Sequence, residues 1–255
     1  MGLVETEAIV LRSYNLAEAD KIVVCLTRNH GMVRAVARGA RRLKSRFGAG
    51  LEPFTVISLG YHEKEGRELV SMRQAEIIRS YFGLTGSAET VAALAYLSEL
   101  VMEFAPPGEP NEKLFRMVRA CVEALAEEPL SLQAVVRYFE VWTLKLGGFF
   151  PEMGACADCG RALREEPDAY LNAEYKVRCG QCSHSLGTAL GRETRAQIRS
   201  IQRLPPLEFA RAASESAART ATELAALTQG LIRRILEREV RGQATFNQNS
   251  AAKPD

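Results

Sequence analysis

Four cysteines in two C-x-x-C pairs have the spacing in this sequence that most clearly indicates a chemical role. Cys156 is paired with Cys159, and Cys179 is paired with Cys182. Each pair is typical of a tight turn that directs two sulfur atoms at one point, and a hairpin between them would bring the two points together. Four thiolates complete the tetrahedral shell that zinc prefers and leave no position for a reactive water. We therefore predict one structural zinc ion at this site.

Other roles for these cysteines fit the sequence less well. Disulfide bonds need an oxidising compartment, but residues 1–15 carry three charged side chains where a cleavable signal has an apolar core. A thioredoxin-like redox site needs one C-x-x-C beside a βαβ unit. His184 is an alternative metal ligand or a solvated histidine. Gly160 and Gly180 are expected to supply positive φ at the two turns. We expect a cytoplasmic protein.

Helices are predicted on both sides of the cysteines. Apolar residues at helical spacing indicate a helix over 89–104, a second helix capped by Asn111, and a third that ends at Gly147-Gly148. Beyond the cysteines, two further helices are predicted over 192–202 and 214–241. After the first 80 residues we predict a helical domain in two parts, 81–150 and 188–241. A four-cysteine zinc-ribbon module is inserted between them at 151–187, and a flexible tail follows at 242–255.

The first 80 residues are predicted to form a small barrel. Short runs rich in Val, Ile and Leu indicate five strands, at 6–14, 21–27, 32–38, 54–61 and 68–78. Turn signals occur at 28–31 and 63–66. Five antiparallel strands in so short a segment favour closure of the sheet, so we predict an OB-like nucleic-acid-binding barrel over 1–80. The fold class is accordingly α+β, with several domains.

Charge is unevenly distributed along a chain of ordinary composition. The 255 residues are 47% hydrophobic and 25% charged, and no apolar stretch reaches membrane-spanning length. The net charge is +2, but residues 21–51 contain eight Lys or Arg and no Asp or Glu. Much of this charge falls in a loop at 39–50 of the predicted barrel. The cationic DNA-binding candidates are Arg34, Arg38, Arg41, Arg42, Lys44 and Arg46.

Three aromatic residues near this basic segment are candidates for stacking on bases. They are Phe47 in the loop and, at strand ends, Tyr14 and Tyr61. The alternative for each aromatic is ordinary core or edge packing, and the alternative for the loop is a solvated basic surface without a ligand.

Two stretches of the sequence carry a family resemblance. The first comprises 37–42 (ARGARR), 44–45 (KS) and 51–54 (LEPF), and the second runs from 139–151 into 156–160 (CADCG). In order and spacing these residues resemble the RecO family of bacterial recombination mediators. The order of the predicted parts, from barrel through helices and zinc module to closing helices, extends the resemblance over nearly the whole chain.

The resemblance implies a non-catalytic protein that acts on DNA. RecO proteins bind single- and double-stranded DNA, anneal complementary strands and, with RecR, help load RecA onto DNA covered by single-stranded DNA-binding protein. They dock on the acidic, phenylalanine-ended tail of that protein through the helical region. By position, the family's DNA contacts would correspond to Arg38, Arg41, Arg42, Lys44 and Arg46, and its zinc ligands to the four paired cysteines. Such a protein would be cytoplasmic and associated with the nucleoid.

Two other classes of function stay open from the residues alone. One is a zinc-containing adaptor that contacts only proteins. The other is an enzyme such as a metal-dependent nuclease, although the sequence contains no G-x-x-x-x-G-K-[ST] loop, H-E-x-x-H helix or G-x-S-x-G elbow. An oligonucleotide-binding titration separates the adaptor from a DNA-binding protein, and a nuclease assay tests the enzyme.

Overall fold

The computed structural model describes residues 2–63, 69–213 and 218–251. The chain divides into two compact units. The barrel unit comprises Met1–Pro129 and Glu239–Asp255, and the helical unit comprises Leu130–Arg238. The N-terminal strands, the helices and the four-cysteine module follow the predicted order, which confirms the α+β fold class.

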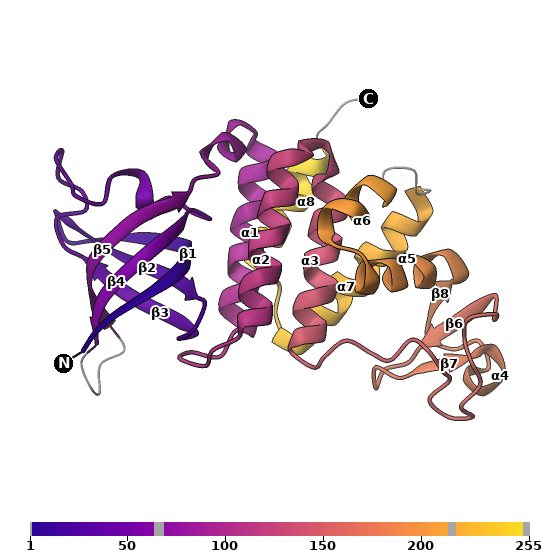
Figure 1. The fold of residues 1–255 in the computed structure, drawn as a ribbon. Coiled ribbons are helices and arrows are strands. Elements are labelled where there is room, and N and C mark those ends of the chain that lie inside the picture. Colours follow the sequence, from indigo (N-terminus) through magenta and orange to yellow (C-terminus); the bar gives the residue numbers. More distant parts are fainter. Residues whose placement is uncertain (1, 64–68, 214–217, 252–255) are drawn as a thin grey trace. The chain divides into compact units, whose positions relative to one another are not determined.

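Five strands close into the predicted OB-like barrel, in the order β1-β2-β3-β5-β4 (Figure 1). The prediction of antiparallel pairing is wrong for β3 and β5, which pair in parallel. The other neighbours pair antiparallel as predicted. The 28–31 turn is confirmed: the Thr27 N–H donates to the Gly31 carbonyl at 2.9 Å, and Gly31 has φ +65°. The other predicted turn, 63–66, lies largely outside the described residues. The strands are β1 (Gly2–Leu16), β2 (Asp20–Thr27), β3 (Met32–Ala37), β4 (Val56–Glu63) and β5 (Leu69–Arg79).

Alternate side chains of the strands fill the barrel. Val23, Cys25, Ala35 and Leu59 are buried in one apolar cluster. This alternation follows from the two-residue period of a strand. Burial raises the pKa of the Cys25 thiol to about 12, so this cysteine acts as a small apolar side chain in the core.

Two predicted helices pack with the barrel in the same unit. They are α1 (Ala88–Phe104) and α2 (Glu112–Glu127), after the short 3₁₀ helix η2 (Phe82–Gly86). The Asn111 side chain accepts the Leu114 N–H at 2.9 Å, which confirms the predicted cap. Arg119 on α2 contacts Glu7 on β1 at 2.5 Å, so the helix is tied to the sheet by an ion pair.

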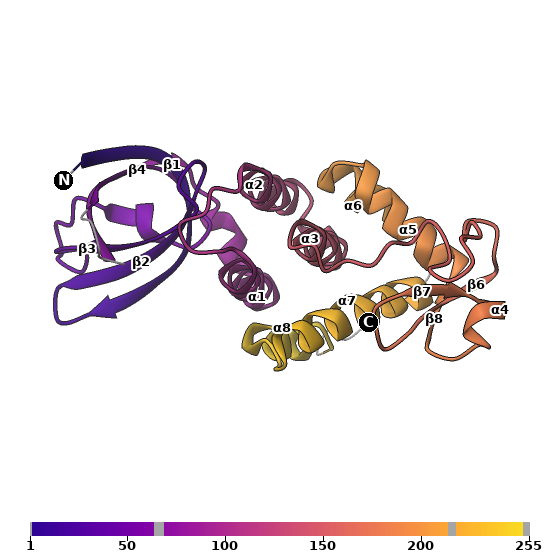
Figure 2. The same ribbon diagram turned by 90° about the horizontal axis from the view of Figure 1, so that it is seen from below.

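The prediction of a flexible tail is wrong for the described residues after 241. Arg241–Ala251 form α8, which lies beside α1 (Figure 2). The Glu99 carboxylate accepts the N–H groups of Arg241 and Gly242, at 3.3 and 2.9 Å, and so satisfies donors at the helix start. Phe246 stacks on Tyr96 with ring centres 6.2 Å apart. The local sequence is mostly polar and therefore predicts a flexible tail. The helix is held by a few long-range contacts that the local sequence does not show.

Four longer helices form the core of the helical unit. They are α3 (Leu132–Leu146), which follows the 3₁₀ turn η3 (Pro129–Ser131), α5 (Arg192–Arg203), α6 (Pro206–Ala213) and α7 (Ala218–Leu236). α3 ends at the predicted glycine pair, and Gly148 has φ +77°. Residues 214–217 of the predicted helix over 214–241 lie outside the described part of the chain. For the remainder the prediction of one helix is wrong, because α7 ends at Leu236 and Glu237 adopts φ +53°. α6 was not predicted.

No helix among the described residues has both the length and the apolar character needed to cross a lipid bilayer.

Candidate nucleic-acid interface and metal centre

The four paired cysteines converge on one point in the helical unit. Their sulfur atoms all lie within 4.8 Å of one another, and those of Cys159 and Cys179 are 3.8 Å apart. Zinc–sulfur bonds of about 2.3 Å in a tetrahedron place the sulfurs about 3.8 Å apart, so this geometry suits a zinc ion. The predicted residues are brought together, and the arrangement can hold a metal ion.

Two tight turns aim these sulfurs. In the first, the Gly160 N–H donates to the Cys156 carbonyl at 2.9 Å, and Gly160 has the predicted positive φ, +71°. In the second, Cys179 ends β7 (Val177–Cys179), and α4 (Gly180–Ser183) follows directly. The prediction of positive φ at Gly180 is wrong because this residue begins a helical turn. The left-handed residues are His184, at the end of α4 with φ +49°, and Ser185 after it with φ +58°. His184 is not among the clustered ligands.

The chain around the cysteines forms a small sheet anchored by a buried arginine. β7 and β8 (Thr188–Gly191) flank β6 (Asp168–Leu171), so the sheet extends beyond the predicted boundary at residue 187. The fully buried Arg195 on α5 donates to the carbonyls of Leu163, Glu166 and Leu190, the first at 3.1 Å. These bonds fix both sides of the module to one helix. The sequence gives no sign that this arginine is buried.

Backbone donors favour the thiolate form of Cys156, one of the four clustered cysteines. Burial acts to raise the pKa of Cys156, but hydrogen bonds from the backbone at Cys159, Cys179 and Asp158 outweigh it and lower the pKa to about 6. A thiolate is the form of cysteine that binds zinc, so the fold prepares this side chain for a cation.

All six DNA-binding candidates are exposed on the barrel unit. Arg34 lies on β3, and Arg38 follows that strand. The other four lie in the basic loop, which we define as residues 39–50: Arg41, Arg42, Lys44 and Arg46.

Hydrogen bonds hold the basic loop against the hairpin between β1 and β2. The Arg41 backbone N–H donates to the Ala19 carbonyl at 2.9 Å, and its guanidinium donates to the Ala17 carbonyl at 3.0 Å. The Gly39 N–H donates to the Asp20 carboxylate at 2.8 Å. The 3₁₀ helix η1 (Gly48–Leu51) closes the loop. The cations are therefore presented on a folded surface.

The aromatic candidates separate by burial. Phe47 and Tyr61 are 3% and 2% exposed and belong to the barrel core, so the hypothesis that they stack on bases is wrong. Tyr14 is 42% exposed, and the Arg12 guanidinium lies 5.1 Å from its ring centre. Arg12 was missed, although its two-residue spacing from Tyr14 on a predicted strand places both side chains on one face.

Strand register places Tyr14 on the same face of the sheet as Arg34, the arginine of β3. Tyr14 is paired with Ile22, which is paired with Val36, so these side chains point to one face of the sheet. Tyr14 therefore lies two strand spacings, about 10 Å, from Val36. Arg34 lies two positions before Val36 and shares its face. An exposed aromatic ring and exposed cations thus occupy one outer surface of the barrel.

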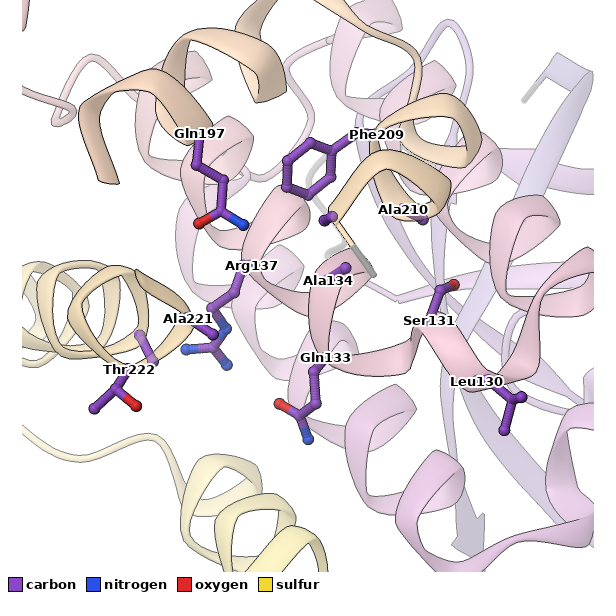
Figure 3. Close-up of a pocket in the computed structure, with 12 residues that line it drawn as sticks. Leu130, Ser131, Gln133, Ala134, Arg137, Gln197, Phe209, Ala210, Ala221 and Thr222 are labelled. Carbon is purple, nitrogen blue, oxygen red and sulfur yellow. The ribbon is translucent and has the colours of Figure 1, made fainter. Parts of the chain in front are cut away.

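The helical unit has a pocket of about 410 Å³ between α3, α5, α6 and α7 (Figure 3). Phe209 forms one wall, and small side chains such as Ala134 and Ala221 leave the space open. The residues that line it, all within the described part of this unit, include the Arg137 guanidinium and no carboxylate. Arg137 is buried and contacts Glu140 at 3.0 Å. Sequence spacing did not reveal this pocket because its walls come from distant segments.

Comparisons with known families cover both halves of the chain. Residues 1–81 match the N-terminal region of Recombination protein O, and residues 86–244 match its C-terminal region. The chain belongs to the RecO family. The predicted resemblance is confirmed, and its division into two family regions falls between the barrel and α1.

Individual members of the RecO family match over most of their length. DNA repair protein RecO of Anaeromyxobacter dehalogenans is 33% identical over 215 residues, 84% of each chain. The proteins of the same name from Koribacter versatilis and Geobacter metallireducens are 31% and 35% identical, over 82% and 78% of this chain and 84% and 80% of theirs.

Proposed function

We propose that this chain is a non-catalytic DNA-binding mediator that anneals complementary single strands and, with RecR, helps load RecA onto DNA covered by single-stranded DNA-binding protein. Membership of the RecO family supports a role in DNA repair. The observation that carries the proposal is the folded basic loop beside β3, which presents exposed cations on an OB-like barrel. Barrels of this class bind nucleic-acid strands with cations and aromatic rings.

Neutralisation of phosphates is the physical basis of the proposed annealing. Two strands repel each other as polyanions, and cations that contact phosphates reduce that repulsion for any sequence. Arg34, Arg38 and the four cations of the basic loop are the proposed contacts with single- and double-stranded DNA. Tyr14 is the proposed stacking residue, since its ring is exposed on the same outer surface.

An annealing assay tests this proposal against both alternatives. Complementary oligonucleotides are first coated with single-stranded DNA-binding protein, and duplex formation is followed with and without the chain. We expect the chain to accelerate annealing and to leave the DNA intact when Mg²⁺ or Mn²⁺ is added. Cleavage products would support the nuclease. No oligonucleotide binding at low salt would support a protein-only adaptor.

We also propose that the pocket of the helical unit receives the acidic, phenylalanine-ended tail of single-stranded DNA-binding protein. The aromatic wall at Phe209 and the alanine side chains suit a phenylalanine ring, and a volume of about 410 Å³ accommodates one. As far as the chain is described, no carboxylate lines the pocket, and its one guanidinium, Arg137, is paired with Glu140. The lining therefore suits an acidic ligand because it does not repel one.

A pair of opposite charges at one position tests the pocket. Ala221 is exposed on α7 at the edge of the pocket, and Glu and Lys both suit a helix. We expect A221E to weaken binding of a fluorescent acidic peptide that ends in phenylalanine, and A221K to preserve or strengthen it. Equal affinities for both variants and the unsubstituted chain would place the tail elsewhere.

The metal and the cellular location complete the proposal. We propose that the four cysteines hold one zinc ion. Its role is to stabilise the module, because four thiolates fill the zinc coordination shell and leave no position for a substrate. We propose that the protein acts in the cytoplasm in association with the nucleoid, where its DNA and its partner RecR would be found.

A further inference from the structure

Leu43 is a fully exposed leucine in the middle of the basic loop. Its sequence neighbours Arg42 and Lys44 are exposed cations, and Arg41 and Arg46 lie within three residues of it. Single exposed leucines are common on protein surfaces and need no explanation by themselves. This one differs in two respects: its position is fixed by the fold, and cations surround it.

A closed turn holds the backbone of Leu43 in place. The Ser45 N–H donates to the Arg42 carbonyl at 3.0 Å, which makes Leu43 and Lys44 the central residues of a β-turn. The loop before the turn is bonded to the β1–β2 hairpin through Arg41, and the chain after it enters the barrel core at Phe47. The β-turn that carries Leu43 is therefore anchored to the barrel at both of its ends, and Leu43 is exposed at its tip.

The surrounding charge restricts what the leucine can contact. Any polyanion bound by Arg42 and Lys44 brings phosphates to both sides of Leu43, and phosphates offer no favourable contact to an apolar side chain. The apolar surfaces of a nucleic acid are its base faces, and leucine is one of the residues that DNA-binding proteins insert between base steps. The charge and the apolar tip together fit a ligand with a charged backbone and apolar faces.

We propose that Leu43 is a wedge that enters between neighbouring bases of the bound DNA while the adjacent cations hold the phosphates. The inference rests on the proposed function, because it requires DNA on this loop. A wedge here separates stacked bases and opens the strand at the point where a complementary strand pairs. It adds a base contact to a loop otherwise equipped only for phosphates.

A fluorescent base analogue reports this insertion directly. The full chain is titrated onto oligonucleotides that carry 2-aminopurine, whose fluorescence rises when its neighbours unstack. We expect the unsubstituted chain to raise the fluorescence at saturation, Leu43→Ala to lower that rise about threefold or more, and the conservative variant Leu43→Met to restore most of it. The affinity should fall by up to about tenfold in L43A, in keeping with the loss of one buried leucine contact.

Two control variants separate the wedge from its surroundings. Leu186→Ala removes an exposed leucine from the four-cysteine module and should leave the fluorescence unchanged. Lys44→Ala should reduce the salt dependence of binding while the fluorescence at saturation persists, whereas L43A should leave the salt dependence unchanged.

The possible outcomes distinguish this inference from the function on which it rests. Salt-dependent binding together with equal fluorescence for L43A and the unsubstituted chain would overturn the wedge and leave the DNA-binding proposal standing. No binding by the unsubstituted chain would overturn both. Unchanged DNA signals but lost binding to a protein partner in L43A would assign the leucine to that partner and also overturn the wedge.

Discussion

The Arg46 guanidinium lies 4.8 Å from the ring centre of Phe47, so one cation of the basic loop rests on an aromatic residue of the barrel core. Such a contact contributes about 0.5–1 kcal/mol at an exposed site and limits where the cation can point. Arg41 is limited in a different way, by its bond to Ala17. The side chains of these cations therefore differ in how far their positions are restrained, although they look alike in sequence. Arg42 and Lys44 belong to the β-turn that carries Leu43.

Truncation of Phe47 should destabilise the protein far more than truncation of Tyr14. Phe47→Ala removes a ring that is 3% exposed, so we expect it to lower the free energy of unfolding by about 3–5 kcal/mol. Tyr14→Ala removes a ring that is 42% exposed, and we expect a loss below about 1 kcal/mol. Denaturant unfolding of both variants measures this difference.

The DNA affinities of the same two variants complete the test. We expect Tyr14→Ala to weaken single-strand binding about tenfold, as expected for the loss of one stacked base. An undiminished affinity in this variant would exclude Tyr14 as a stacking residue. Both aromatics lie near the basic segment in sequence, and only the packing of the loop onto the barrel decides which one is buried.

The strands and most helices follow from local signals that the sequence carries. Alternation of apolar residues locates the five strands, and Asn111 and the 147–148 glycine pair mark helix ends as observed. Elements that depend on distant partners were missed. α8 needs the carboxylate of Glu99 and the ring of Tyr96, and neither contact is visible in the polar sequence 241–251. The same limit applies to Arg195, whose three carbonyl partners come from other segments.

Close packing at the start of α8 makes Gly242 a sensitive position. A Cβ atom at this residue would lie 2.7 Å from the Tyr96 Cα, so we expect Gly242→Ala to destabilise the barrel unit by about 1–3 kcal/mol. Gly230→Ala is the matched control, because no atom lies within 4 Å of a Cβ there and alanine favours the α7 helix. Thermal unfolding should show opposite shifts, and equal shifts would contradict the packing of α8 on α1.

The four-cysteine module should depend on its metal for stability. We expect purified protein to contain one zinc per chain, and chelation to destabilise the module, because thiolate ligation contributes directly to folding. Metal analysis and hydrogen exchange across β6, β7 and β8 measure these effects. Cys25→Ala is the control and should retain zinc, since Cys25 lies in the barrel core. Metal-free protein that is indifferent to chelator would refute the zinc site.

At the scale of the whole chain, the cationic DNA-binding candidates and the four clustered cysteines belong to different units. The cationic candidates lie in the barrel unit, whereas the four cysteines and the pocket lie in the helical unit. Under the proposed function, one unit would bind DNA and the other would bind a protein tail. Sequence alone located the cations and the cysteines because both are clustered along the chain. It could not locate the pocket, whose walls are contributed by α3, α5, α6 and α7.

A salt titration of single-strand binding tests the central claim most directly. The basic-loop variant replaces Arg41, Arg42, Lys44 and Arg46 with alanine. The control removes four exposed charges of the same sign from the helical unit: Arg164, Lys176, Arg211 and Arg233.

We expect the basic-loop variant to bind DNA more weakly. The magnitude of its slope of log affinity against log salt should fall by up to about 3, because each phosphate contact to a single strand contributes about 0.7 to that slope. The control should keep the slope of the unsubstituted chain. An unchanged slope in the basic-loop variant would contradict the account.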